Sequence, residues 1–114
     1  MKKDCIFCKI ASGEFPADKI YEDEDVLAFY DIRPQAPKHI LVIPKLHLDS
    51  PGEAKEEHDA LMGKVMRIGA DLAKREKIGD GFRFIFNSGE NAGQTVFHIH
   101  LHVLGGRRMT WPPG

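Results

Sequence analysis

The sequence predicts an α+β protein with an antiparallel five-stranded sheet, one long helix and one short helix. The order of its patterns supports this prediction, because a hairpin, a strand, a helix and two more strands follow one another along the chain. That order suits an antiparallel sheet, and we expect both helices on one side of it.

The first elements are a short helix and a hairpin. Asp4 is a candidate N-cap for a helix that continues through Ala11. Residues 19–22 and 26–32 are rich in β-forming residues and are separated by an acidic turn. This pattern predicts a β-hairpin.

The middle of the chain contains a strand and the long helix. Residues 39–43 read His-Ile-Leu-Val-Ile, which predicts a third strand. Residues 50–53 form a capping-box pattern with proline in the first helical position, so we expect a helix from there to about Lys77. The buried stripe of this helix is predicted to contain Leu61, Val65, Ile68 and Leu72.

Two more strands complete the chain. Residues 82–87 and 96–104 are predicted strands, and a polar loop with two glycines lies between them. The tail after residue 104 contains too much glycine and proline for regular structure. A length of 114 residues fits one domain, 1–114.

The last predicted strand places histidine at every second position. Strand alternation puts His98, His100 and His102 on one face. The other face, expected to be core, consists of Phe97, Ile99, Leu101 and Val103. The three histidines spread over about 13 Å, so they reach a single metal ion only awkwardly. A solvent-facing strand that holds histidine by chance is the plain alternative, but histidine is an uncommon residue.

The loop before this strand is suited to an anion. Gly89 and Gly93 allow backbone N–H groups to approach phosphate oxygens, and Thr95 adds a hydroxyl. A neutral imidazole is a nucleophile or a general acid and base. A glycine loop that leads directly into alternating histidines therefore predicts a site for phosphate chemistry.

These motifs resemble those of the histidine triad (HIT) family, and the resemblance runs nearly end to end. Residues 98–104, H-I-H-L-H-V-L, are similar to the family signature. Residues 29–45 resemble its nucleotide-binding strand and loop, and residues 89–98 its phosphate loop. The tail, residues 105–114, resembles that of the histidine triad nucleotide-binding (Hint) branch, including W-P-P-G. The resemblance implies a HIT-like fold.

The resemblance also implies an activity: hydrolysis or transfer of a nucleoside monophosphate, usually AMP, from an amine or another leaving group. The expected enzyme is a purine nucleoside phosphoramidate hydrolase. His100 would attack the α-phosphate and form a phosphohistidine, which water then resolves. His102 and the segment Gly93, Gln94 and Thr95 would stabilise charge on the phosphate oxygens. Thr95 would help to protonate the leaving amine, at a position where the Hint branch more often has serine.

Further residues are implied around the nucleotide. Asp31 would accept hydrogen bonds from the ribose hydroxyls, and Asn87 would touch the ribose or phosphate. His39 would support the site from the adjacent strand. The residues expected to flank the base, for which ordinary core packing is the alternative, are Phe7, Phe29 and Ile32.

Both cysteines lie in one C-x-x-C motif. Cys5 and Cys8 are i and i+3 on the predicted short helix, so they share a face. A redox role is disfavoured because no βαβ pattern surrounds the motif. Resemblance to bacterial zinc-binding members of the family implies a structural zinc ion held by Cys5, Cys8, His47 and His98. No metal is expected for the chemical step, and an exposed loop histidine is the alternative for His47.

Composition argues against several other classes of protein. Sixteen basic and seventeen acidic residues give a formal charge of −1, which does not indicate a surface for duplex nucleic acid or a membrane. The first residues contain two lysines but no long apolar run, so neither a signal peptide nor a membrane span is predicted. We expect a soluble, cytoplasmic protein whose partner is a purine nucleotide.

Three other functions stay open at this point: a dinucleoside polyphosphate hydrolase of the same family, a zinc-stabilised nucleotide-binding module that acts through protein partners, and a protein that only binds metal. The tail and Asn87 favour the Hint branch. The resemblance also implies a homodimer whose two sheets join edge to edge. Trp111 is a candidate anchor that either reaches the partner's site or packs on its own subunit.

Overall fold

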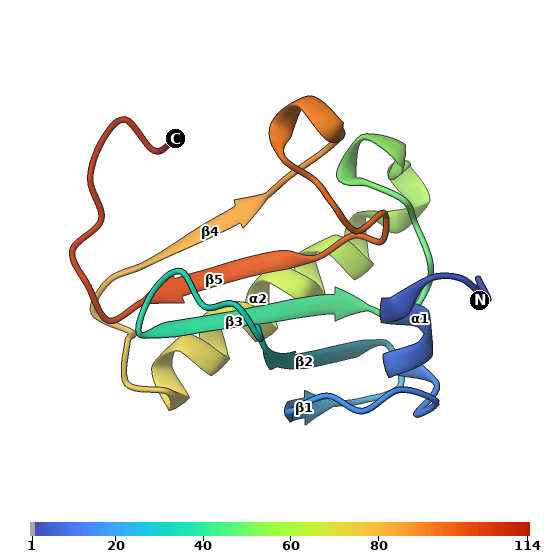
Figure 1. Ribbon diagram of the computed structural model, residues 1–114, viewed down its shortest axis with the longest axis horizontal. Helices are drawn as coiled ribbons and strands as arrows, with labels where there is room; N and C mark the ends of the chain where they lie inside the picture. Colours follow the sequence, from blue (N-terminus) through green and yellow to red (C-terminus); the bar gives the residue numbers. More distant parts are fainter. Residues whose placement is uncertain (1) are drawn as a thin grey trace.

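A five-stranded antiparallel sheet forms the centre of the protein, as a computed structural model describes it for residues 2–114 (Figure 1). The strands are β1 Lys19–Glu22, β2 Val26–Tyr30, β3 Lys38–Pro44, β4 Phe82–Phe86 and β5 Leu101–Gly105. Their order in the sheet is β1-β2-β3-β5-β4, and every neighbouring pair is antiparallel. The α+β fold class with one long and one short helix is confirmed.

Within the described residues, 2–114, the helical elements are two α-helices and three short 3-10 turns. They are α1 Ile6–Ala11, α2 Asp59–Arg75, η1 Pro51–Glu53, η2 Glu56–His58 and η3 Glu90–Ala92. Among the residues 2–114, no helix combines the length and the apolar character that crossing a membrane requires.

The two α-helices cover opposite faces of the sheet, so the prediction that both lie on one side is wrong (Figure 1). On β2, Val26 and Ala28 belong to the core cluster of α2, whereas Leu27 and Phe29 pack with α1. Successive residues of the central strands are apolar, and both faces must therefore be covered. The proposed site lies on the α1 face.

The long helix begins at Asp59, eight residues after the predicted first helical position, Pro51. Ser50 makes no side-chain capping bond, and the 3-10 turns η1 and η2 precede α2. Ala54 and Lys55 have extended backbones that separate these turns. The segment from residue 51 to residue 58 contains no apolar stripe, so continuing the helix through it would bury nothing.

The predicted stripe of α2 is confirmed, and it forms the larger core cluster with the sheet. Val65, Ile68 and Leu72 are at most 2% exposed, and Leu61 is partly buried. Full burial of each such side chain contributes roughly 1.5–3 kcal/mol. The helix can approach β5 closely because Gly69 has no side chain, and a Cβ there would lie 3.0 Å from Leu101.

The last strand is shorter than predicted. Residues 96–98 form a bend, and pairing in β5 begins only at Leu101. Phe97, expected in the core, is 46% exposed. The segment is held by other bonds, since the Ile99 N–H donates to the Leu48 carbonyl at 2.8 Å. His98 and His100 thus stand just before the sheet ladder, and only His102 lies within it.

Candidate active site and metal-binding cluster

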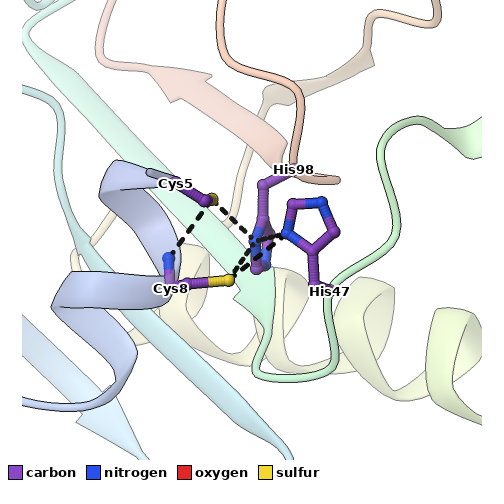
Figure 2. A group of neighbouring side chains, drawn as sticks. All are labelled: Cys5, Cys8, His47 and His98. Carbon is purple, nitrogen blue, oxygen red and sulfur yellow. Dashed lines mark hydrogen bonds between the residues drawn. The ribbon is translucent and has the colours of Figure 1, made fainter. Parts of the chain in front are cut away.

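Cys5, Cys8, His47 and His98 converge, although they come from three separate parts of the chain (Figure 2). Both cysteines come from the start of α1, where Cys5 rather than Asp4 is the N-cap and accepts the Cys8 N–H. His98 Nδ1 lies 3.4 Å from Cys5 Sγ and 3.5 Å from Cys8 Sγ. His47 Nδ1 lies 3.3 Å from Cys8 Sγ and 3.1 Å from His98 Nδ1.

In both histidines the partner of Nε2, the nitrogen that points away from the cluster, decides which ring nitrogen carries the proton. His98 Nε2 lies 2.7 Å from the Pro44 carbonyl, which only accepts, so this nitrogen carries the proton. His47 Nε2 likewise faces the Asp49 carboxylate at 2.7 Å. In the neutral rings each Nδ1 atom therefore has a lone pair, and both lone pairs point into the cluster beside the two sulfur atoms. Such partners for the outer nitrogen are typical of histidines that bind metal.

The dimensions of the cluster suit zinc. A tetrahedral ion with Zn–S of about 2.3 Å and Zn–N of about 2.0 Å separates neighbouring ligand atoms by roughly 3.3–3.8 Å. The measured separations of 3.1–3.5 Å lie close to that range. Burial lowers the pKa of His98 to about 4, which keeps its ring neutral and able to coordinate.

A cavity of about 310 Å³ lies on the same face, beside this cluster. Its apolar wall includes Phe7, Phe29 and Ile32, together with residues that the sequence had not singled out. These additional residues include Ile6, Ile10, Phe15 and Leu41. Its polar groups include Asp31, Thr95, His100 and His102. The structure therefore brings together most of the residues predicted around a nucleotide.

One hydrogen-bond chain fixes the protonation of the histidines at this cavity. The Gln35 backbone N–H donates to His39 Nδ1 at 3.0 Å, so the neutral His39 ring carries its proton on Nε2. His39 Nε2 lies 2.8 Å from His102 Nδ1 and donates to it. His102 therefore carries its own proton on Nε2. Asp31, 3.4 Å from His39 Nε2, adds a negative charge beside the pair.

His100 has the opposite arrangement. Its Nδ1 lies 2.8 Å from the His98 carbonyl and must donate to it, which leaves Nε2 as the lone pair. The ring is packed edge-on against Phe7, with centroids 5.1 Å apart, and only 8% of the residue is exposed. Position and protonation of this ring are both set by contacts within the protein.

Burial keeps the imidazoles at the cavity neutral. Desolvation lowers the pKa values of His39 and His100, although the Asp31 charge opposes this effect in both. Desolvation and the neighbouring histidines lower the pKa of His102 to about 4. A neutral His100 has an available lone pair, and a neutral His102 still has an N–H to donate.

The loop residues are divided between the cavity and its support. Thr95 lines the cavity. Within the described part of the chain, Asn87, Gly93 and Gln94 do not line it. The buried Gln94 side chain accepts the Gly89 N–H at 2.8 Å and donates to the Asp49 and Val96 carbonyls. Gln94 thus holds the loop, and its side chain does not face the cavity.

The sequence analysis did not predict several hydrogen-bond partners of the site histidines, because these partners are backbone groups. The Gln35 N–H and the Pro44 carbonyl have no side-chain signal. Asp49 did have one, since it lies two residues after His47 and its carboxylate can reach that ring. Trp111 is 82% exposed, so its ring does not pack on its own subunit.

The fold and the two side-chain groups define a class: a small α+β protein with a histidine-lined cavity beside a Cys₂His₂ cluster. A family model described as the HIT domain matches residues 12–109, and the chain belongs to this family.

Relatives agree with this assignment. A HIT family hydrolase from Legionella pneumophila has a TM-score of 0.96 and 48% identity, covering 97% of this chain and 100% of its own. A histidine triad nucleotide-binding protein from Candida albicans has a TM-score of 0.82 and 31% identity, covering 96% and 83%. A 14 kDa zinc-binding protein from Zea mays is 49% identical over 111 residues, covering 96% of this chain and 87% of its own.

Proposed function

We propose that the chain is a nucleotide hydrolase and transferase that releases AMP from substrates of the adenosine 5′-phosphoramidate type. The observation that carries this proposal is the unprotonated Nε2 of His100, whose lone pair is available at a cavity with an apolar wall. A buried, neutral imidazole is a competent nucleophile without a separate base. The similarity to a protein described as a hydrolase and to one described as nucleotide-binding supports it.

In the first step a bond forms between His100 Nε2 and the α-phosphorus, while the bond from phosphorus to the leaving nitrogen breaks. The electron pair of that bond stays on the nitrogen, which takes a proton from water, and Thr95 would donate a hydrogen bond to it. In the second step water attacks the phosphorus and gives a proton to the hydroxide left from the first step. The bond to His100 breaks with its electron pair returning to Nε2, and AMP leaves. His102 Nε2–H would stabilise the charge on the nonbridging oxygens as a neutral donor.

The cavity wall supplies the binding contacts in this proposal. Phe7 and Phe29, whose ring centroids lie 5.5 Å apart, would contact the base together with the 92% exposed Ile32. Asp31 would accept hydrogen bonds from the ribose hydroxyls. Gly93 and Asn87 would contribute only if the phosphate extends beyond the cavity toward the loop.

The test is turnover of adenosine 5′-phosphoramidate by the wild-type protein and by His100→Ala, with His58→Ala as a control histidine outside the site. We expect His100→Ala to lose at least about 10³-fold in kcat/KM. A short pulse followed by mass spectrometry should show one AMP added to the wild-type chain, and a chase should remove it. Turnover by His100→Ala at the wild-type rate would refute the nucleophile.

The same experiment separates the alternatives. A dinucleoside polyphosphate hydrolase would form the AMP adduct from a dinucleoside polyphosphate faster than from the phosphoramidate. A nucleotide-binding module would bind AMP and form no adduct with either compound.

We propose further that zinc is the resident metal of the cluster formed by Cys5, Cys8, His47 and His98. Two lone pairs and two sulfurs converge there at distances close to those of a tetrahedral site. The similarity to a plant protein described as zinc-binding supports this choice. Bound zinc would link α1 to the segments that contain His47 and His98, and we expect no metal in the chemical step.

A homodimer joined at the edge of the sheet also belongs to this proposal. Strand β4 is one of the two edge strands of the sheet, and its residues from Phe82 to Phe86 are all only half-buried. An edge strand with exposed apolar side chains is a natural pairing surface. Sedimentation should give twice the chain mass, and Ile85→Lys should shift it to the monomer. A cytoplasmic location stays a prediction of the sequence.

A further inference from the structure

A second cavity lies next to the proposed nucleotide cavity and shares part of its wall. Ile6, Thr95 and Val96 line both cavities. The second cavity also measures about 310 Å³, and Cys5 and His47 of the Cys₂His₂ cluster form part of its wall. Thr95 therefore stands on a ridge between two separate spaces.

Phe97 gives the second cavity an apolar surface that the proposed function does not use. Strand alternation would bury this ring, but the bend at residues 96–98 turns it outward. It is 46% exposed and lines the second cavity together with Ile6 and Val96. An exposed aromatic ring beside aliphatic side chains is a favourable surface for an apolar ligand group.

The ridge between the cavities is held in place. Gln94 is only 2% exposed, and its side chain bonds to three backbone groups of the surrounding segments. Gly93 takes the left-handed conformation, φ +91°, that the loop needs just before the ridge. A ligand that crosses Thr95 therefore meets a fixed geometry.

Phosphoryl transfer places the attacking and the leaving atom roughly in line. With the nucleotide in the first cavity and His100 as nucleophile, the leaving amine would depart past Thr95. We propose that the second cavity binds this leaving group and selects amines with an aromatic or aliphatic body over ammonia. The inference rests on the proposed function, and it names the class of leaving group.

Charge does not compete with this apolar selection. Lys2 and Asp4, which also line the cavity, have opposite charges, so the rim has no net charge from these two side chains. Lys2 Nζ is moreover 3.9 Å from the Asp49 carboxylate. Cys5 and His47 also line the cavity, but they belong to the Cys₂His₂ cluster. The apolar contacts that distinguish one amine from another are therefore those with Ile6, Val96 and Phe97.

The test compares adenosine 5′-phosphoramidate with its N-benzyl derivative. In the wild-type protein we expect a higher kcat/KM for the benzyl compound, and in Phe97→Ala a loss of roughly three- to tenfold for that compound alone. Phe15→Ala is the matched control, because Phe15 is 48% exposed and lines only the first cavity. Phe15→Ala should lower kcat/KM for both substrates by the same factor. The affinity for AMP should not change in Phe97→Ala.

Calorimetry on His100→Ala makes the result independent of turnover. The benzyl compound should bind more tightly than the unsubstituted one, and the advantage should disappear when Phe97→Ala is added. Equal binding of both compounds, or an advantage that survives Phe97→Ala, would overturn the leaving-group site. If Phe97-dependent binding is found but the wild-type protein turns over neither compound, the proposed chemistry fails and the site stands.

Discussion

The two pairs of facing histidines in this protein have nearly the same spacing but opposite chemistry. His47 and His98 face each other at 3.1 Å between nitrogens, and His39 and His102 at 2.8 Å. In the first pair both outer nitrogens donate, to Asp49 and to the Pro44 carbonyl, so two lone pairs meet. In the second pair the outer nitrogen of His39 accepts from the Gln35 N–H, so a proton lies between the rings.

The partner on the far side of each ring therefore decides what the near side can do. In the His47–His98 pair, two lone pairs lie beside two sulfur atoms, and this set of donor atoms can bind a cation. In the His39–His102 pair, a hydrogen-bond donor faces an acceptor, so both nitrogens already have a partner. Asp31, His39 and His102 also place their ligand atoms within 4.8 Å of one another. The Gln35 bond argues that this second group is a proton network and not a metal site.

The largest expected effect is on metal content. Cys8→Ser should lower the affinity for zinc more than about 10³-fold, because a thiolate ligand is lost from a site with four ligands. His39→Ala should keep one zinc per chain. Zinc per chain is measured by atomic emission after dialysis against a weak chelator, and α1 in Cys8→Ser should become sensitive to proteolysis.

Either of two results would break the comparison. Zinc loss in His39→Ala would place metal in the second pair, and full zinc content in Cys8→Ser would remove it from the first.

The second effect is on catalysis. His39→Ala removes the donor that holds His102, and we expect kcat to fall about 10²-fold with a smaller change in KM. His39→Gln should recover part of the rate, because the glutamine amide can donate to His102 Nδ1. Steady-state kinetics on both variants tests this, with zinc content measured in parallel. Equal rates for the alanine and glutamine variants would mean that His39 only fills space.

The sequence predicted most of the fold, and it did so from apolar periodicity. The stripe at Val65, Ile68 and Leu72 and the continuous apolar run along β3 could be read from the order and spacing of the residues alone. The start of α2 was wrong because a local capping pattern at Ser50 suggested a helix that has no apolar face to bury. The covering of both sheet faces was missed for the opposite reason, since continuous apolar runs do not show which helix covers which side.

The site was only partly predictable. The alternating histidines and the C-x-x-C motif identified the side chains. The structure groups His98 with His47 and the two cysteines, and it groups His102 with Asp31 and His39. The tautomers could not be predicted, because they depend on backbone groups at Gln35, Pro44 and His98. Those groups are present in every residue and become specific only through the fold.

A smaller effect should follow from the outer partner of the metal cluster. Asp49→Ala removes the carboxylate that faces His47 Nε2, and we expect zinc affinity to fall about tenfold to a hundredfold. Asp25→Ala is a matched control, since the two aspartate side chains are 50% and 49% exposed. Competition with a fluorescent zinc chelator measures both affinities. Equal affinities would mean that Asp49 does not orient His47.

The smallest effect concerns pH. Burial lowers the pKa of His102 to about 4, below the ordinary value of 6.5, so this ring stays neutral where an exposed histidine is charged. At pH 5.5 more than about nine-tenths of His102 should be neutral, against about one-tenth for an ordinary histidine. A proton on His102 Nδ1 would face the His39 N–H and break their bond, so His102-dependent activity is lost only as pH falls through about 4.

Stability should fall earlier, as the pH drops from about 6.5 to about 4, because the unfolded chain takes up this proton near pH 6.5 and the folded chain does so only near pH 4. Titration of the ring resonances by NMR in zinc-loaded protein measures the pKa directly. A His102 pKa near 6.5 would mean that the closed hydrogen bond to His39 does not set the protonation of this pair, and the contrast with the metal cluster would then rest on the sulfurs alone.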